Sequence, residues 1–208
     1  MKAWNFLSVG ILAIAFFSCQ QKTENIDKTR VNVNRDSLTL DSLSKEIRRT
    51  PEDASLFHER SKVYFKFKKY SDAINDAVLA TRLDSTKPEY FFTLSGYFLH
   101  QGVSSKSKET LEKCLRLHPQ NAQAHIKMAD LYLIVRMYKE ALLNLSEAQR
   151  LNPHIAEIYY LKGRIYREGE KPDKAIENFQ IAVNKNPEYY EAYILLGLMH
   201  AETGDSVA

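Results

Sequence analysis

Apolar and polar positions along this chain recur with a fixed period. Between Ala54 and Tyr189 the pattern runs through four copies of a 34-residue unit without an insertion or a deletion. Within each copy it predicts two antiparallel helices joined by a short turn. A period of this length indicates a solenoid, in which each unit packs on its neighbours, and argues against a single globular core.

Three kinds of position keep their character from copy to copy. Small residues recur where two helices must approach closely, and an aromatic residue recurs where a side chain fills the space between units. A proline near the end of a copy stops its second helix before the next unit begins. The small residues are Ser61, Ser95, Ala129 and Gly163; Ala73, Ser107, Ala141 and Ala175; and Ala80, Cys114, Ala148 and Ala182; the aromatics are Tyr64, Phe98, Tyr132 and Tyr166; the prolines are Pro119, Pro153 and Pro187, with Ser85 in the first copy.

The pattern resembles the tetratricopeptide repeat family. This resemblance implies an all-α fold, a right-handed superhelical solenoid of antiparallel helix pairs. Several residue types recur at the repeat positions where the family has them, although some copies have a different residue there. The fourth-position aromatic is Phe57, Phe91 and Tyr159 but His125 in the third copy, and the seventh-position leucine is Leu94 but Arg60, Met128 and Lys162 elsewhere.

The segments on either side of the four copies complete the predicted organisation. A polar stretch without an apolar period precedes a short amphipathic segment with Leu40, Leu43 and Ile47 on one face, which we expect to cap the first repeat. After the fourth copy, Ile194 to Met199 is too apolar for a cap that faces solvent. The predicted divisions are a lipoprotein-type signal at 1–18, a tether at 19–35, a capping helix at 36–53, repeats at 54–87, 88–121, 122–155 and 156–189, and the first helix of an incomplete fifth repeat at 190–208.

The first residues have the features of an export signal. Lys2 supplies the positive start, an apolar run ends at Phe17, and a small residue precedes Cys19. The segment is similar to bacterial lipoprotein signals, which implies that Cys19 becomes lipidated and anchors the chain, with the outer membrane favoured because Gln20 follows. The alternative is ordinary secretory cleavage after Ala15.

Composition and motifs give no indication of catalysis. The formal net charge of +3 is too small to make nucleic acid the expected main partner. Cys114 occupies a small-residue position and is expected to be a packed thiol, and the six histidines lack metal-ligand spacing. We therefore expect no enzyme activity, no cofactor, no metal site and no small-molecule substrate.

The resemblance implies that the first helix of each pair lines a concave groove. Its inward positions predict a groove with an apolar middle and charged margins, which suits a peptide or an amphipathic helix of another protein. Leu99, Leu133 and Ile134 have an alternative role, packing within their own repeats. The predicted groove residues are Phe92, Leu99, Ile126, Leu133, Ile134 and Tyr160, with Lys62 and Arg164 at the margins.

The sequence therefore predicts a membrane-anchored, non-catalytic scaffold for another protein. Similar lipoproteins help to assemble envelope or outer-membrane complexes, and this narrower role rests on that analogy. The alternative is a docking or sensory region of a larger enzyme or signalling protein that continues past Ala208. A carbohydrate-capture lipoprotein would need long loop insertions, which the gapless period does not contain.

Overall fold

The computed structural model describes residues 39–204. The expected signal, Cys19 and the tether lie outside this range. Within it the backbone consists of helices joined by turns and short loops, so the predicted all-α class is confirmed. The helices are residues 39–49, α2 (Ala54–Lys66), α3 (Tyr70–Leu83), α4 (Pro88–His100), α5 (Ser104–Leu117), α6 (Ala122–Ile134), α7 (Tyr138–Leu151), α8 (Ala156–Glu168), α9 (Pro172–Lys185) and α10 (Tyr190–Thr203).

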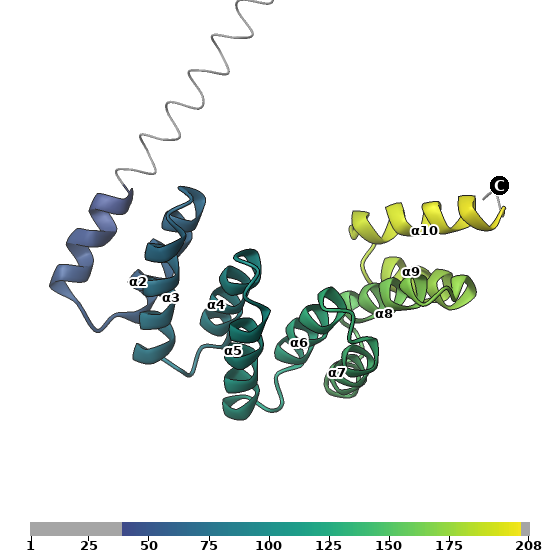
Figure 1. The fold of residues 1–208 in the computed structure, drawn as a ribbon, viewed down its shortest axis with the longest axis horizontal. Helices are drawn as coiled ribbons and strands as arrows, with labels where there is room; N and C mark the ends of the chain where they lie inside the picture. The colour runs from purple at the N-terminus through teal and green to yellow at the C-terminus, as the bar shows by residue number, and fades with distance from the viewer. Residues whose placement is uncertain (1–38, 205–208) are drawn as a thin grey trace, which may run out of the picture.

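Antiparallel helix pairs follow one another along an arc (Figure 1). We call α2, α4, α6, α8 and α10 the first helices and α3, α5, α7 and α9 the second helices. First helices of adjacent repeats contact each other, as α4 does α6 and α6 does α8, so they form the concave side. The second helices α5 and α7 lie on the outer side in Figure 1.

Small side chains set the distance between paired helices. Ala73, Ala141 and Ala175 are completely buried, and Ser107 nearly so, each where a second helix meets its partner. Gly163 shows the constraint most sharply, since a Cβ atom there would lie 2.5 Å from the Phe179 ring. Two helices at this separation leave no room for a larger residue.

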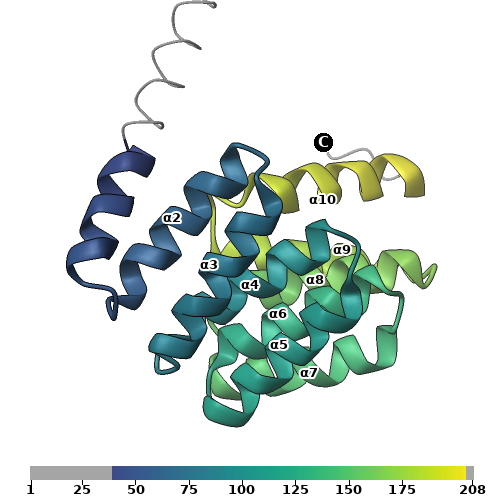
Figure 2. The same cartoon turned by 60° about the vertical axis from the view of Figure 1, so that its left-hand side comes forward.

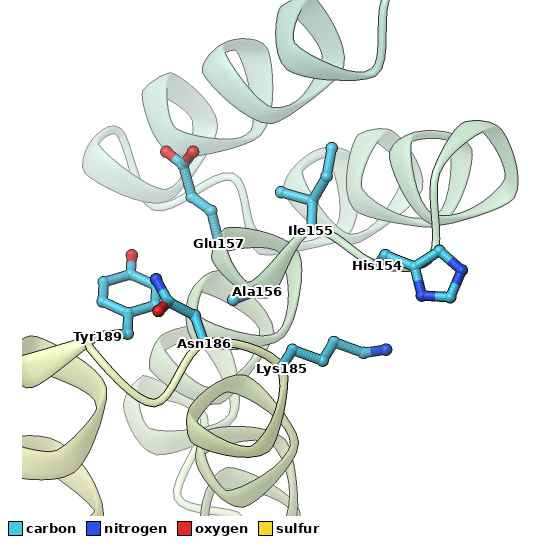
Figure 3. Close-up of a pocket in the computed structure, with 7 residues that line it drawn as sticks. All are labelled: His154, Ile155, Ala156, Glu157, Lys185, Asn186 and Tyr189. Carbon is cyan, nitrogen blue, oxygen red and sulfur yellow. The ribbon is translucent and has the colours of Figure 1, made fainter.

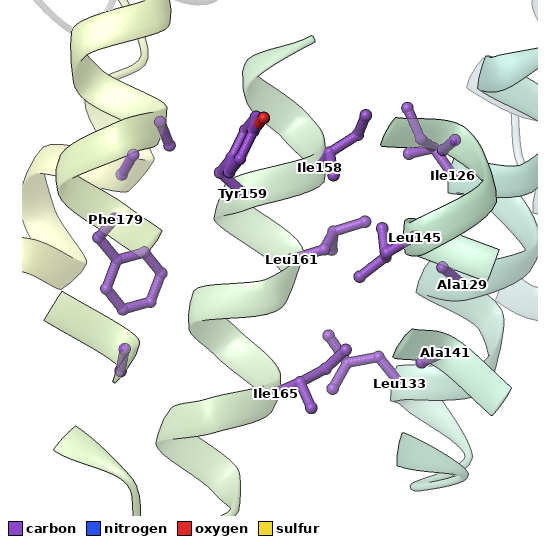
Figure 4. Close-up of a cluster of buried hydrophobic side chains, with 14 of the residues drawn as sticks. Ile126, Ala129, Leu133, Ala141, Leu145, Ile158, Tyr159, Leu161, Ile165 and Phe179 are labelled. Atoms are coloured by element: carbon purple, nitrogen blue, oxygen red, sulfur yellow. The ribbon is translucent and has the colours of Figure 1, made fainter. Parts of the chain in front are cut away.

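The largest cluster of buried side chains lies around α8. In Figure 4, Ile158, Leu161 and Ile165 point from α8 toward α6 and α7, and Phe179 lies on the opposite side of α8. Each helix pair thus buries apolar surface against the preceding and the following units. This nearest-neighbour packing is what holds a solenoid together.

Each turn between a first and a second helix contains one residue with a left-handed backbone. These residues are Lys68, Gly102, Arg136 and Glu170, at the same phase of the four repeats, with φ between 54° and 73°. Two backbone hydrogen bonds close each turn; in the first, Lys68 N–H donates to Phe65 and Lys69 N–H to Tyr64. This geometry ends the helix and favours glycine, and of the four left-handed positions only that of the second turn is a glycine, Gly102.

The helix at residues 39–49 packs against the first repeat. Ile47 contacts a cluster that includes Phe57 and Tyr90. Beside it, Arg60 donates two hydrogen bonds of 2.6 and 2.8 Å to the Asp76 carboxylate and one of 3.2 Å to Ser44 of this helix. Figures 1 and 2 both place the helix next to α2, at one end of the arc, with α10 at the other.

Candidate partner-binding face

We define the concave face as the inward positions of the first helices. They are the second, fifth, ninth, twelfth and thirteenth residues of each repeat. Neighbouring first helices touch across this face, so its side chains interact between repeats as well as with solvent. It comprises Ser55, His58, Lys62, Phe65 and Lys66; Glu89, Phe92, Gly96, Leu99 and His100; Gln123, Ile126, Asp130, Leu133 and Ile134; Glu157, Tyr160, Arg164, Arg167 and Glu168; and Glu191, Ile194, Leu198, Ala201 and Glu202.

The α4 section offers an open apolar position. Phe92 and Leu99 are both partly exposed, and each packs with its lower part against the cluster around Leu111 and Met128. Gly96 lies between them on the same side of the helix and is exposed; a Cβ atom there would meet no atom within 4 Å. The helix therefore presents two apolar side chains with free space between them.

Two predicted groove residues are not on the surface. Ile126 is 0% exposed and Leu133 is also buried, so the structure contradicts their assignment to partner binding. Figure 4 shows Ile126 beside Ile158, in the interface between the third and fourth repeats. The curvature brings adjacent first helices together there and closes the groove over these side chains. Ile134, beside the turn that follows α6, is 50% exposed.

Between α6 and α8 the concave face is polar, in contrast to the apolar strip on α4, so the apolar middle that the sequence predicted is limited to part of the face. Gln123 donates a hydrogen bond of 2.9 Å to Glu157, and the Lys127 ammonium lies 3.1 Å from the same carboxylate. Arg164 pairs with Asp130 at 3.5 Å. These contacts link α6 to α8, so Arg164, predicted as a charge at the margin of the groove, also pairs with a neighbouring repeat.

Burial raises the pKa of Asp130, and the nearby cations Arg164 and Lys127 counteract this effect. A carboxylate that loses water needs such cations to stay charged. The Asp130 and Arg164 pair therefore links two repeats and places one charge of each sign on the concave face.

Tyr160 is partly exposed within an aromatic and cationic group. Its ring centre lies 4.9 Å from that of Tyr189, and the Arg164 guanidinium lies 5.7 Å from the Tyr160 ring centre. Burial raises the pKa of the Tyr189 hydroxyl, which therefore stays protonated and available as a hydrogen-bond donor. Flat rings with a polar edge are suited to holding a peptide.

A pocket of about 330 Å³ adjoins this group at the start of α8. Figure 3 shows Glu157 and Tyr189 on one side of it and Lys185 on another. Sequence reasoning identified none of the loop residues that line it, because the pocket forms where two inter-repeat loops meet. The lining residues are His154, Ile155, Ala156, Glu157, Lys185, Asn186 and Tyr189.

The α2 section is more closed than its neighbours. His58 is buried; its Nε2 lies 2.9 Å from the Thr93 hydroxyl of α4, and its ring lies 4.5 Å from that of Tyr90. Burial lowers the pKa of His58. Lys62 is exposed and pairs with Glu59 at 2.8 Å. This section therefore presents charge to solvent, and its partly exposed Phe65 stacks on Tyr97, with ring centres 4.3 Å apart.

The described part of the chain contains no group of three or more side chains placed to hold a metal ion. None of its helices combines the length and apolarity that crossing a membrane requires. Cys114 is fully buried, and burial raises the pKa of its thiol to about 11, which keeps it protonated. It is the packed thiol that the sequence predicted.

Comparison with known proteins supports the fold. Residues 126–177 and 160–208 match the family model described as tetratricopeptide repeat. A search of curated proteins found no significant match.

Solved structures share the architecture over most of the chain. MamA 41-end from Desulfovibrio magneticus RS-1 is 26% identical, with a TM-score of 0.58 over 73% of this chain and 86% of that one. YrrB, titled a TPR protein with an unusual peptide-binding site, is 20% identical, with a TM-score of 0.59 over 86% and 89%. The thermophilic TPR protein TTC0263 from Thermus thermophilus is 14% identical, with a TM-score of 0.67 over 87% and 98%. Residues 126–208 thus match the tetratricopeptide repeat model, and the solved structures share the solenoid fold of this chain.

Proposed function

We propose that this tetratricopeptide repeat solenoid is a non-catalytic scaffold that binds a peptide or helix of another protein on its concave face. Tetratricopeptide repeat proteins bind other proteins, and the similar structure YrrB is titled as having a peptide-binding site. The observation that carries the proposal is Gly96. A glycine inside a helix costs about 1 kcal/mol relative to alanine, and no contact in the described structure requires one there.

The surroundings of Gly96 fit a bound chain. Phe92 and Leu99 flank it with apolar surface. The polar groups of α6 and α8 follow along the same face and offer hydrogen bonds to a peptide backbone. An apolar centre with polar groups beside it is the usual composition of a peptide-binding surface. The open space lets the bound backbone approach α4 closely.

A blocking substitution tests the proposal without removing a packed side chain. Peptides selected from a random phage-displayed library on the native full chain would be titrated against native protein, Gly96→Leu and Leu143→Ala. Gly96→Leu fills the open position, so we expect affinity to fall at least about tenfold, or about 1.4 kcal/mol. Leu143, on the outer helix α7, is 70% exposed, so its truncation serves as the matched control and should leave affinity unchanged.

Unchanged circular dichroism spectra would show that both variants fold. If Gly96→Leu binds like the native chain while Leu143→Ala loses binding, the concave face is not the binding surface. Selection of no peptide that binds saturably would also contradict the proposal.

We also propose that Cys19 carries a lipid that tethers the scaffold to a membrane, with the outer membrane favoured. This rests on the apolar run that ends before Ser18 and Cys19. Such a tether would hold the groove close to envelope complexes whose assembly it could assist. Cys19→Ala should move the protein from the membrane to the soluble fraction and abolish incorporation of labelled fatty acid. Membrane retention of the variant, with no label in the native chain, would contradict the tether.

A further inference from the structure

The pocket beside Tyr189 has two chemically different walls. It encloses about 330 Å³ between the loop that precedes α8 and the loop that precedes α10. In Figure 3 the Glu157 carboxylate and the Tyr189 hydroxyl point to the same side, whereas Lys185 extends the other way, toward His154. The Lys185 ammonium lies 5.0 Å from the ring centre of Tyr159. The wall formed by Glu157 and Tyr189 is therefore acidic and aromatic, and we call it the acidic wall.

Several carboxylates act on the acidic wall. Burial raises the pKa of the Tyr189 hydroxyl, and nearby acidic groups, among them Glu157, Glu191 and Asp130, raise it further. They oppose the loss of the proton because it would add another negative charge beside them, and the same field favours a cation. Lys127 pairs with Glu157 from α6, but a carboxylate has about four lone pairs, so Glu157 can also accept hydrogen bonds from the pocket.

The chain already holds a guanidinium in similar surroundings. The Arg164 guanidinium lies 5.7 Å from the ring centre of Tyr160 and 3.5 Å from the Asp130 carboxylate. The Tyr160 ring centre is in turn 4.9 Å from that of Tyr189. A planar cation that lies over a tyrosine and pairs with a carboxylate gains from both contacts. The acidic wall, with Glu157 beside Tyr189, offers a second place of this kind.

The acidic wall is specific to the fourth repeat. Glu157 and Tyr189 are the second and the thirty-fourth residues of that repeat, and none of the three earlier repeats combines a carboxylate with an aromatic residue at these positions. The corresponding pairs are Ser55 and Lys87, Glu89 and Asn121, and Gln123 and Ile155. The repeat fold therefore does not require this combination, which favours a role in binding.

We propose that the acidic wall binds the guanidinium of an arginine in the peptide that lies on the concave face. This inference rests on the proposed function and names one residue of the partner. The guanidinium lies against the Tyr189 ring and donates to Glu157, and the aliphatic part of the arginine contacts Ile155. Arginine suits this wall better than lysine because its planar group can stack on a ring while it donates to a carboxylate.

A single capped amino acid tests the pocket without the rest of a peptide. N-acetylarginine methylamide would be titrated into the isotope-labelled full chain and followed by nuclear magnetic resonance, with the uncharged isostere N-acetylcitrulline methylamide as the matched ligand. The arginine ligand should shift the amide signals of Glu157, Asn186 and Tyr189 saturably, with a millimolar Kd. The citrulline ligand should bind at least about fivefold more weakly. Absence of saturable shifts, or equal binding of the two ligands, would overturn the proposal.

Two substitutions take their residues from the third repeat. Glu157→Gln and Tyr189→Ile introduce the residue types of Gln123 and Ile155, and each should weaken binding of the arginine ligand at least about fivefold. Glu89→Gln makes the same change at the second position of the second repeat, so it is the matched control and should leave binding unchanged. Circular dichroism should show native helicity in all three variants. Native affinity in both Glu157→Gln and Tyr189→Ile would contradict the proposal.

The peptides selected on the native chain separate this inference from the proposed function. Citrulline in place of the peptide arginine should weaken binding to the native chain at least about tenfold, and binding to Glu157→Gln much less. If Gly96→Leu weakens binding of a peptide whose arginine can be replaced at no cost, the concave face binds peptides but the acidic wall does not hold the arginine. If Glu157→Gln weakens binding and Gly96→Leu does not, the pocket is supported and the site at Gly96 is contradicted.

Discussion

At the scale of single residues, glycines in the first helices distinguish occupied faces from open ones. Gly163 lies under Phe179, whereas a Cβ atom at Gly96 would meet nothing within 4 Å. The two positions are adjacent in the repeat, so the sequence alone gives them similar roles. The structure separates a glycine required for packing from one that leaves a surface open.

This contrast predicts opposite effects on stability. Gly163→Ala should lower the free energy of unfolding by about 1 to 3 kcal/mol, because the buried Phe179 ring must move to admit a methyl group. Gly96→Ala should raise it by up to about 1 kcal/mol through higher helix propensity. Urea denaturation of both variants measures the two changes. If both substitutions changed the free energy of unfolding by the same amount and in the same direction, the close contact of Gly163 with Phe179 would not be what restricts residue size at position 163.

His58 makes stability depend on pH. Burial lowers its pKa below the ordinary value of 6.5, so the unfolded chain binds the proton more readily than the folded chain. Acidification through the unfolded pKa should therefore destabilise the fold, and this loss should disappear as pH rises above it. His58→Gln, which can keep the contact with the Thr93 hydroxyl but cannot titrate, should show a smaller fall in Tm between about pH 7 and pH 5.

Identical slopes of Tm against pH in the two proteins would contradict this assignment. The charged side chains that act on His58, namely Lys62, Glu59 and Glu89, are present in both proteins, so the comparison isolates the imidazole.

Polar residues at apolar positions were visible in the sequence, but their partners were not. Arg60 and Lys162 replace the leucine expected at the seventh position of a repeat. The structure pairs Arg60 with Asp76, and Lys162 donates to Gln149 of the preceding repeat. Both partners lie on second helices, and the sequence pattern alone does not fix which polar side chains meet across the interface between helices.

At the scale of elements, the helix pairs were predictable because small, aromatic and proline residues recur at the same positions in each repeat. The assignment of groove residues was less successful, since position within a helix does not determine how closely the next helix approaches. Ile126 shares its repeat position with Phe92 but is covered by the fourth repeat. The pocket at Tyr189 was missed because it depends on two loops that are far apart in sequence.

The turns between paired helices give a further test at this scale. Lys68, Arg136 and Glu170 hold left-handed backbone conformations that cost side-chain-bearing residues about 1 kcal/mol, and Gly102 occupies the equivalent position without that cost. Lys68→Gly should raise the free energy of unfolding by up to about 1 kcal/mol, and Gly102→Ala should lower it similarly. Chemical denaturation measures both. If Gly102→Ala left the free energy of unfolding unchanged, the left-handed backbone at this position would not cost stability.

At the scale of the whole molecule, stacking of the repeats brings separate helices into one surface. No single repeat contains the concave face; the α4 strip around Gly96 and the α6 to α8 polar contacts lie on different repeats. Each repeat contacts only its neighbours, so the concave surface depends on how adjacent repeats stack. The exposed side chains of the outer helices can therefore differ in sequence without changing this surface. The proposed binding function is thus a property of the arc.

Nuclear magnetic resonance mapping of a selected peptide on the isotope-labelled full chain tests the central claim most directly. Amide shifts should change at concave-face positions of the first helices, around Gly96 in α4 and around Asp130 and Arg164 in α6 and α8. The second helices α5 and α7 should show little change apart from residues packed directly beneath the face. Shift changes confined to α5, α7 and α9, with the first helices unaffected, would place the partner on the outer side and contradict the account.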